Sequence, residues 1–186
     1  AATGNFGSTN GISSPACIKN ATAIGSVSKS DEISPFSNRN SVTDLFAPGE
    51  DIISTVPNGF CFLCDSTGFL KLNGTSMATP HVTGAFALLR QFERLRENII
   101  LRPGQIQDVL NSTGKQIEDR FGSGLLFSRI DIYNALLLVN RTSFFVEQVQ
   151  EGKGIKIIDV DVKFNGKKSS NIENNKKIRI EAKPDS

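Results

Sequence analysis

The sequence predicts an α/β fold, in which short buried strands alternate with helices. Two observations carry this prediction. Apolar segments at residues 22–27, 42–46 and 51–56 have the length and composition of short strands. Longer segments that begin at Thr75 and at Pro103 repeat apolar residues at helical spacing. This alternation of segments is typical of layered α/β domains.

The first part of the chain is expected to hold loops and strands. Residues 5–16 are rich in Gly, Ser, Thr and Asn, a composition that predicts a loop. The strand candidates at 42–46 and 51–56 are separated by a turn signal at residues 47–49. Residues 57–74 then predict a hairpin with a loop.

Three helices are predicted after the hairpin. Apolar residues that recur at helical spacing mark the first one, which begins at Thr75: Val82, Ala85, Phe86, Leu89, Phe92 and Leu95. We expect this helix to end near Asn98. Pro103 opens a second helix, in the favoured early position, that runs to about Leu110. Residues 130–139 predict the third.

The composition changes near Asn140. Residues 143–186 alternate polar and apolar side chains as strands do, with polar turns expected at 165–166 and 171–175. We therefore expect residues 141–186 to be the beginning of a small β-rich module, truncated at its end. Residues 1–140 would form the α/β part.

Composition bounds the possible functions. A chain of 186 residues can hold one substantial core, or one core and a small appendage. The net charge of +2 is too small to indicate nucleic acid as a partner. No apolar run approaches the roughly 20 residues that span a bilayer. The chain opens without an initiator Met or a signal-like segment, so we expect it to begin inside a fold.

The chain has three cysteines, Cys17, Cys61 and Cys64. The C-x-x-C spacing of the last two is compatible with a metal site, a disulfide or buried thiols. Zinc normally takes four ligands, and three Cys and one His would need a carboxylate in addition. The sequence alone cannot assign a pairing.

One serine stands at a position suited to chemistry. Gly74 and Thr75 lead Ser76 into the start of an apolar helix, where unpaired N–H groups and the helix dipole favour negative charge. Pro80 lacks the N–H that would bond the carbonyl of Ser76. Taken alone, these features are also those of an ordinary helix-capping serine.

Residues 73–84, Asn-Gly-Thr-Ser-Met-Ala-Thr-Pro-His-Val-Thr-Gly, resemble the serine motif of the subtilisin and proteinase K (subtilase) family at every fixed position. The similarity extends from Ala1 to about Val139. It implies part of a subtilisin-like three-layer core with a parallel sheet. It also implies a secreted serine endopeptidase that acts on polypeptides through an acyl-enzyme on Ser76, with a propeptide or an N-terminal part of the same protein as a possible partner.

The segment Ala2-Thr3-Gly4-Asn5 resembles the Ala-x-Gly-Asn segment of the same family. The resemblance implies that the side-chain amide of Asn5 donates to the oxyanion. In isolation Asn5 would be read as a turn residue. Ala2, Thr3, Gly4 and Ser13 are implied as substrate-binding residues, with Ser13 near the floor of the main specificity pocket.

Further family markers are collinear with these. Phe36-Ser37-Asn38 and residues 44–49 and 53–57 match segments that lie between the Asn and Ser motifs. In the family, the residue that matches Asp44 joins loop carbonyls in a weak cation site. Here those carbonyls would belong to Lys19 and Ala21, and the cation would be Ca²⁺ or Na⁺. The alternative interpretation of Asp44 is a solvated carboxylate, and no cofactor is expected to be required.

The single histidine is not expected to be the catalytic base. His81 follows Ser76 by five residues, which on a helix turns its side chain about 140° away. In the family the Asp and His motifs precede the Asn segment, so we expect both catalytic partners to be absent and the chain alone to be inactive. The alternative function is a non-catalytic subtilase-like binding or scaffolding domain.

Overall fold

The structure is a computed structural model of the chain. It describes residues 1–144, 148–150, 155–157, 160–164, 167–168 and 178–182. The chain divides into two compact units, Ala1–Ala135 and Leu136–Ser186, which are considered separately below. The division falls within the last helix of the α/β part. The predicted domain boundary at residue 140 stays a prediction.

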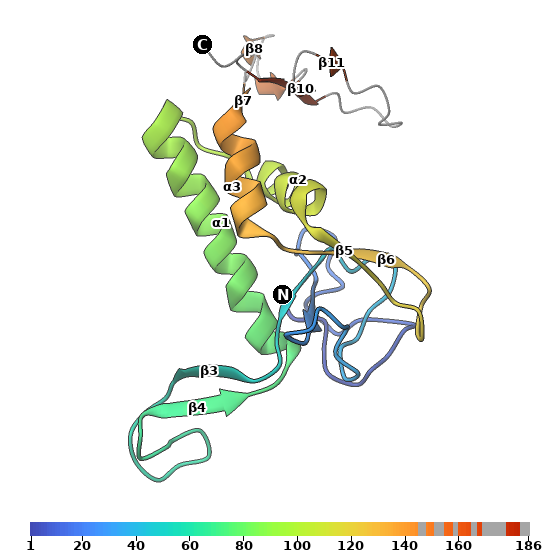
Figure 1. Ribbon diagram of the computed structural model, residues 1–186, viewed down its shortest axis with the longest axis vertical. Helices are drawn as coiled ribbons and strands as arrows, with labels where there is room; N and C mark the ends of the chain where they lie inside the picture. Colours follow the sequence, from blue (N-terminus) through green and yellow to red (C-terminus); the bar gives the residue numbers. More distant parts are fainter. Residues whose placement is uncertain (145–147, 151–154, 158–159, 165–166, 169–177, 183–186) are drawn as a thin grey trace. The chain divides into compact units, whose positions relative to one another are not determined.

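A four-stranded sheet forms the centre of the first unit (Figure 1). Its strands, in spatial order, are β1 (Ile24–Val27), β2 (Leu45–Pro48), β6 (Leu126–Arg129) and β5 (Lys115–Glu118). β1, β2 and β6 are parallel, and β5 is antiparallel to β6. The first residues of the chain extend this sheet, because Ala2 forms a parallel bridge with Ile24. The predicted α/β class with a largely parallel sheet is therefore confirmed.

The predicted hairpin is present as β3 (Ile52–Thr55) and β4 (Phe69–Leu72), which pair antiparallel. The turn predicted at residues 47–49 is wrong in part, since β2 continues through Pro48. Pro48 can close this strand because proline is tolerated at strand ends, where its missing N–H leaves no ladder position empty.

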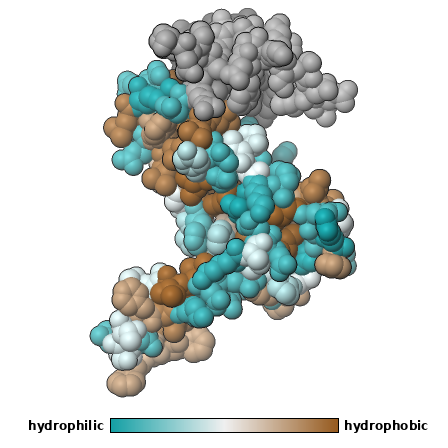
Figure 2. Space-filling model, viewed as in Figure 1, coloured by the Kyte–Doolittle hydropathy of each residue, from teal (hydrophilic) through white to brown (hydrophobic). Residues whose placement is uncertain are grey.

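The loop between β3 and β4 carries a disulfide between Cys61 and Cys64. This excludes the zinc and free-thiol interpretations of the C-x-x-C sequence, whereas Cys17 is an exposed free thiol. Phe60 and Phe62 beside the disulfide are almost fully exposed, and Figure 2 shows apolar side chains gathered at this end of the hairpin.

The described part of the chain contains three helices: α1 (Thr75–Glu97), α2 (Pro103–Thr113) and α3 (Ile132–Arg141). α1 packs against β1 and β2, and α2 contacts α1 and β6. α1 ends where Asn98 takes the left-handed conformation and donates its N–H to the Glu93 carbonyl, an asparagine C-cap. Within the described ranges, no helix is long and apolar enough to cross a membrane.

The core of the sheet centres on Val27, Phe46, Ile117 and Phe127. The rings of Phe46 and Phe127 lie 4.8 Å apart between centroids, within the range of favourable aromatic pairs. Gly25 makes room for this pair, because a Cβ at that position would overlap the Phe46 ring. Truncating Phe46 to Ala would cost about 3–5 kcal/mol of stability on general grounds.

The second unit contains the strands that the alternating pattern predicts. A sheet joins β11 (Lys167–Lys168), β10 (Val160–Phe164), β12 (Ile178–Ala182) and β7 (Thr142–Phe144), in that order. β8 (Gln148–Gln150) and β9 (Ile155–Ile157) form a separate antiparallel pair. The turns predicted at 165–166 and 171–175 lie outside the described residues.

Candidate active site

Ser76 lies in the first turn of α1 with an exposed side chain, at the end of the sheet where β2 stops. Two glycines bring the helix start close to the sheet. The N–H of Gly74 donates to the carbonyl of Gly49 over 2.8 Å. A Cβ at Gly49 would lie only 2.6 Å from the Gly74 carbonyl oxygen, so position 49 has no space for a side chain at this contact.

The helix start presents a free N–H beside the nucleophile. Met77 and Ala78 donate their N–H groups back to the Gly74 carbonyl, and Thr75 donates its N–H to Asn5. None of the described residues accepts a hydrogen bond from the N–H of Ser76. The first N–H groups of a helix have no partner inside the helix, so this donor is open to a bound group.

The carboxamide of Asn5 is held in one orientation by Thr75. Its Oδ1 accepts the backbone N–H of Thr75 over 2.9 Å and the Thr75 hydroxyl over 2.8 Å. The same hydroxyl accepts the N–H of Gly4 over 3.2 Å. A backbone N–H can only donate, so it fixes the carbonyl oxygen of the amide towards Thr75. The NH₂ group of Asn5 therefore points away from Thr75.

The missing side chain of Gly74 leaves open the space between these two donors. A Cβ at Gly74 would lie 3.2 Å from Nδ2 of Asn5 and 3.7 Å from the backbone nitrogen of Ser76. Two N–H donors thus flank one small space beside the serine hydroxyl. Such a pair is suited to an oxygen that gains negative charge during acyl transfer.

His81 lies on the same helix and has a local partner. Its Nδ1 is 2.9 Å from the carbonyl oxygen of Met77, one helical turn earlier, and the side chain is partly buried. A carbonyl can only accept, so this contact requires the proton on Nδ1. The geometry is that of a structural histidine, as the helical spacing predicts.

The residues predicted to bind substrate lie together around Gly4. A Cβ at Gly4 would overlap Oγ of Ser13, and Ser13 donates its N–H to the Thr3 carbonyl over 2.8 Å. Thr3 is fully buried, and its hydroxyl has no partner among the described residues. Ala2 is bridged to the sheet beside it. Their contact with substrate stays a prediction.

Asp44 has two protein partners. One carboxylate oxygen accepts the N–H of Ala23 over 2.7 Å, and the other accepts the side-chain amide of Gln107 over 2.9 Å. The interpretation of Asp44 as a carboxylate that only contacts solvent is therefore incomplete, because the carboxylate joins the loop before β1 to α2. A cation would have to share oxygens that already accept hydrogen bonds. The described residues contain no cluster of three or more His, Cys, Asp or Glu side chains able to hold a metal.

A buried ion pair lies between the segment before β2 and the turn after β5. Arg39 contacts both carboxylate oxygens of Asp119, over 2.8 and 2.9 Å. Burial acts to raise the pKa of Asp119, but hydrogen bonds from Arg39 and Ser123 outweigh it and lower the pKa to about 2. The carboxylate of Asp119 is therefore ionised well above pH 2.

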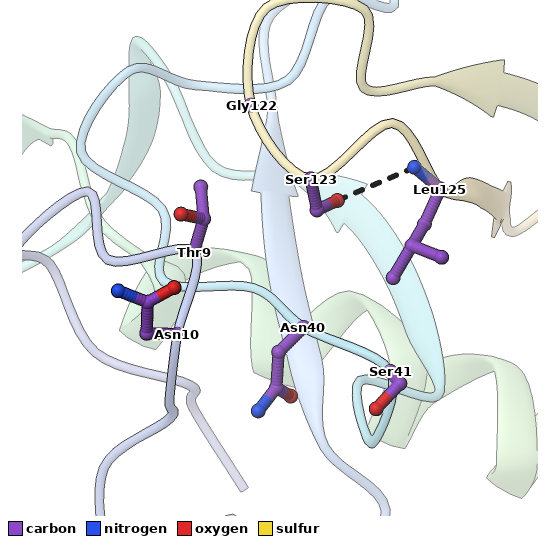
Figure 3. Close-up of a pocket in the computed structure, with 7 residues that line it drawn as sticks. All are labelled: Thr9, Asn10, Asn40, Ser41, Gly122, Ser123 and Leu125. Carbon is purple, nitrogen blue, oxygen red and sulfur yellow. Dashed lines mark hydrogen bonds between the residues drawn. The ribbon is translucent and has the colours of Figure 1, made fainter.

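A separate hollow of about 470 Å³ lies beside this ion pair (Figure 3). Neutral hydroxyl and amide side chains make up most of its wall, and its lining residues are Thr9, Asn10, Asn40, Ser41, Gly122, Ser123 and Leu125. None of these is a predicted catalytic or substrate-binding residue. The hollow is therefore distinct from the space beside Ser76.

Comparison with known proteins identifies the family of the chain. The family model described as the subtilase family matches residues 1–126. The chain belongs to the subtilase family. The solved structure of the patellamide maturation protease PatA superposes with a TM-score of 0.63 at 29% sequence identity, covering 75% of this chain and 50% of that one. The predicted subtilisin-like fold is thus confirmed.

Two curated subtilase relatives show how much of such a protein the chain represents. The major intracellular serine protease of Bacillus subtilis (strain 168) is 49% identical over 82 residues, which is 44% of this chain and 23% of the relative. Subtilisin E of the same organism is 37% identical over 125 residues, 66% of this chain and 29% of the relative. The chain spans about a quarter of their length. Because the name of the first relative says intracellular, the secreted location stays a prediction.

Sequence reasoning missed how this subtilase site is supported. Thr75 and Gly74 belong to the serine motif, but their contributions are visible only in the structure. Thr75 orients the carboxamide of Asn5, and Gly74 leaves open the space between the two N–H donors. Asn38 was matched as a family marker without any role. Its side chain proves to be buried against the segment that carries Asn5. Its place in the matched Phe36-Ser37-Asn38 marker was the available signal.

Proposed function

We propose that this chain carries the nucleophile and the oxyanion hole of a serine endopeptidase. The Ser76 hydroxyl attacks the carbonyl carbon of a peptide bond, and its proton passes to a histidine base. The N–H of Ser76 and Nδ2 of Asn5 donate to the oxyanion. The C–N bond then breaks, the amine leaves with the proton, and water hydrolyses the acyl-enzyme with return of the proton to Ser76.

The orientation of Asn5 is the observation that carries this proposal. Two hydrogen bonds from Thr75 turn the carboxamide so that its donor, and not its acceptor, lies beside the free N–H of Ser76. A turn asparagine would need no such arrangement. Preorganised donors of this kind contribute because they need no reorientation when charge develops on the oxygen.

The base and the carboxylate that orients it come, in this proposal, from residues outside the 186 printed here. The chain has one histidine, and its Nδ1 is committed to the Met77 carbonyl. A neutral serine is a weak nucleophile without an adjacent base. In a subtilisin, loss of the histidine alone costs about 10⁶ in kcat, so the chain alone should not turn over substrate.

The specificity pocket of this endopeptidase would accept large apolar or aromatic side chains. Ser13 is small, and it lies directly under Gly4, which itself has no side chain. A shallow or charged floor would instead select small or oppositely charged residues. Profiling on a peptide library tests this, and a strict preference for basic or acidic residues before the scissile bond would contradict it.

Labelling with a fluorophosphonate tests the proposed activity, because this reagent reacts with activated serines. The complete protein encoded by the reading frame that contains this chain should be labelled at Ser76 and should cleave a chromogenic peptide. Ser76→Ala should abolish both, whereas Ser54→Ala, at an exposed serine of β3, should change neither. An unlabelled, inactive complete protein would favour the binding or scaffolding alternative. Labelling of Ser76 in residues 1–186 alone would mean that a base exists within this chain.

A further inference from the structure

Asn38 is a buried asparagine, 3% exposed, beneath the segment that carries Asn5. Its Oδ1 accepts the N–H of Phe6 over 2.9 Å and the N–H of Ser8 over 3.0 Å. Its own backbone N–H donates to the Gly4 carbonyl over 2.9 Å. One residue therefore holds both chain neighbours of Asn5.

A carboxamide is the group that this position requires. The Thr3 carbonyl accepts from Nδ2 of Asn38 over 3.0 Å, on the other side from the two N–H groups that Oδ1 accepts. The segment between Gly4 and Ser8 forms no strand or helix, so these backbone groups need partners from elsewhere. The carboxamide of Asn38 supplies an acceptor for the N–H groups of Phe6 and Ser8, and a donor for the carbonyl of Thr3.

Asn38 is itself fixed from both directions. The hydroxyl of Ser37 accepts the N–H of Ser26 in β1 over 3.0 Å. Arg39 donates its N–H to the Ser8 carbonyl over 2.8 Å, and its guanidinium binds Asp119. Hence the support beneath Asn5 is joined to the central sheet and to the turn after β5.

We propose that Asn38 is a positioning residue for the oxyanion hole. It acts through Asn5, by holding residues 4–8 so that Nδ2 of Asn5 stays beside the N–H of Ser76. It does not touch the reacting atoms. The inference rests on the proposed function of Ser76 and Asn5, and it adds a residue on which their geometry depends.

The expected consequence is a loss of turnover with little change in substrate binding. Asn38→Ala removes the side-chain bonds to Phe6, Ser8, Thr3 and Ser13, which releases the segment around Asn5. A displacement of about 1 Å at a catalytic group can cost on the order of 10²-fold in rate. We therefore expect kcat to fall about 10- to 100-fold in the complete protein, with KM within about threefold of the wild-type value.

A double-mutant cycle separates positioning from general destabilisation. In the Asn5→Ala background, Asn38→Ala should lower kcat by less than about threefold, because the group it positions is already absent. An equal fold loss in both backgrounds would overturn the inference. Asn40→Ala is the matched control: it removes an asparagine whose Oδ1 accepts the N–H of Val42, two residues along the same segment, and should leave kcat unchanged.

Two further variants keep the result interpretable. If Asn38→Ala does not fold, Asn38→Asp keeps the shape and the acceptors for Phe6 and Ser8 but removes the donor to Thr3. It should then give a smaller loss in kcat that again disappears in the Asn5→Ala background. Ser76→Ala separates a failure of the proposed protease function from a failure of the proposed role of Asn38. Retained activity in Ser76→Ala would refute the proposed function. An inactive Ser76→Ala, together with an equal loss of kcat from Asn38→Ala in both backgrounds, would refute the role of Asn38 alone.

Discussion

The space left by Gly74 allows a direct test of the proposed oxyanion hole. In Gly74→Ala the new methyl group would lie 3.2 Å from Nδ2 of Asn5 and 3.5 Å from Sδ of Met77. Contact at 3.2 Å forces Asn5 to move by a few tenths of an ångström, and the methyl group crowds the space between the two donors. Loss of one oxyanion donor costs about 10²–10³ in kcat, a figure measured on a subtilisin. We expect a fall of that size in kcat.

Steady-state hydrolysis of a chromogenic peptide by the complete protein measures this effect. Gly84→Ala is the control, because it is the same substitution within α1, the helix that Gly74 precedes, and a Cβ there meets nothing within 4 Å. It should leave kcat unchanged and add roughly 0.5–1 kcal/mol of stability. Thermal melts show whether Gly74→Ala stays folded. A folded Gly74→Ala protein with wild-type kcat would refute the placement of the oxyanion between Asn5 and Ser76.

Three more predictions concern other groups. The lowered pKa of Asp119 contributes about 2 kcal/mol of stability that is present above its ordinary pKa of 3.8 and is lost as the pH falls through about 2. Urea unfolding between pH 2 and 6 should show this dependence, and Asp119→Asn should lack it. Peroxide should oxidise Met77, the only Met of the chain, and lower turnover; full activity with Met77 shown by mass spectrometry to be oxidised would contradict this. If Asp44 helps to bind Ca²⁺, calcium should raise the melting temperature by mass action, and Asp44→Asn should reduce that gain; an unchanged calcium response would place the site elsewhere.

The long helix and the serine were the parts most accessible from the sequence. Val82, Ala85 and Leu89 repeat at helical spacing and are buried against the sheet, so periodicity alone located α1. The predicted end near Asn98 also holds, since asparagine tolerates the left-handed conformation found there. Local physics decides both features, which is why a single sequence was sufficient.

The strands β5 and β6 were not predicted. Each has four residues, and β6 buries only Phe127 and Ser128 fully. Such short segments carry too few side chains for an alternating pattern, and their place in the sheet depends on contacts with β2 that the sequence does not display. The hydrogen bonds of the Asn38 side chain were missed for the same reason, because their partners lie 25 or more residues away.

The hydrogen bonds between Asn5 and Thr75 join residues 70 positions apart in the sequence. Closing a loop of that length costs roughly 4 kcal/mol of chain entropy beyond a constant. The contacts of the folded sheet have to offset this cost for the two donors to meet. A newly made or unfolded chain would therefore carry Ser76 without the proposed oxyanion hole, so in this proposal electrostatic stabilisation of the transition state depends on assembly of the tertiary structure.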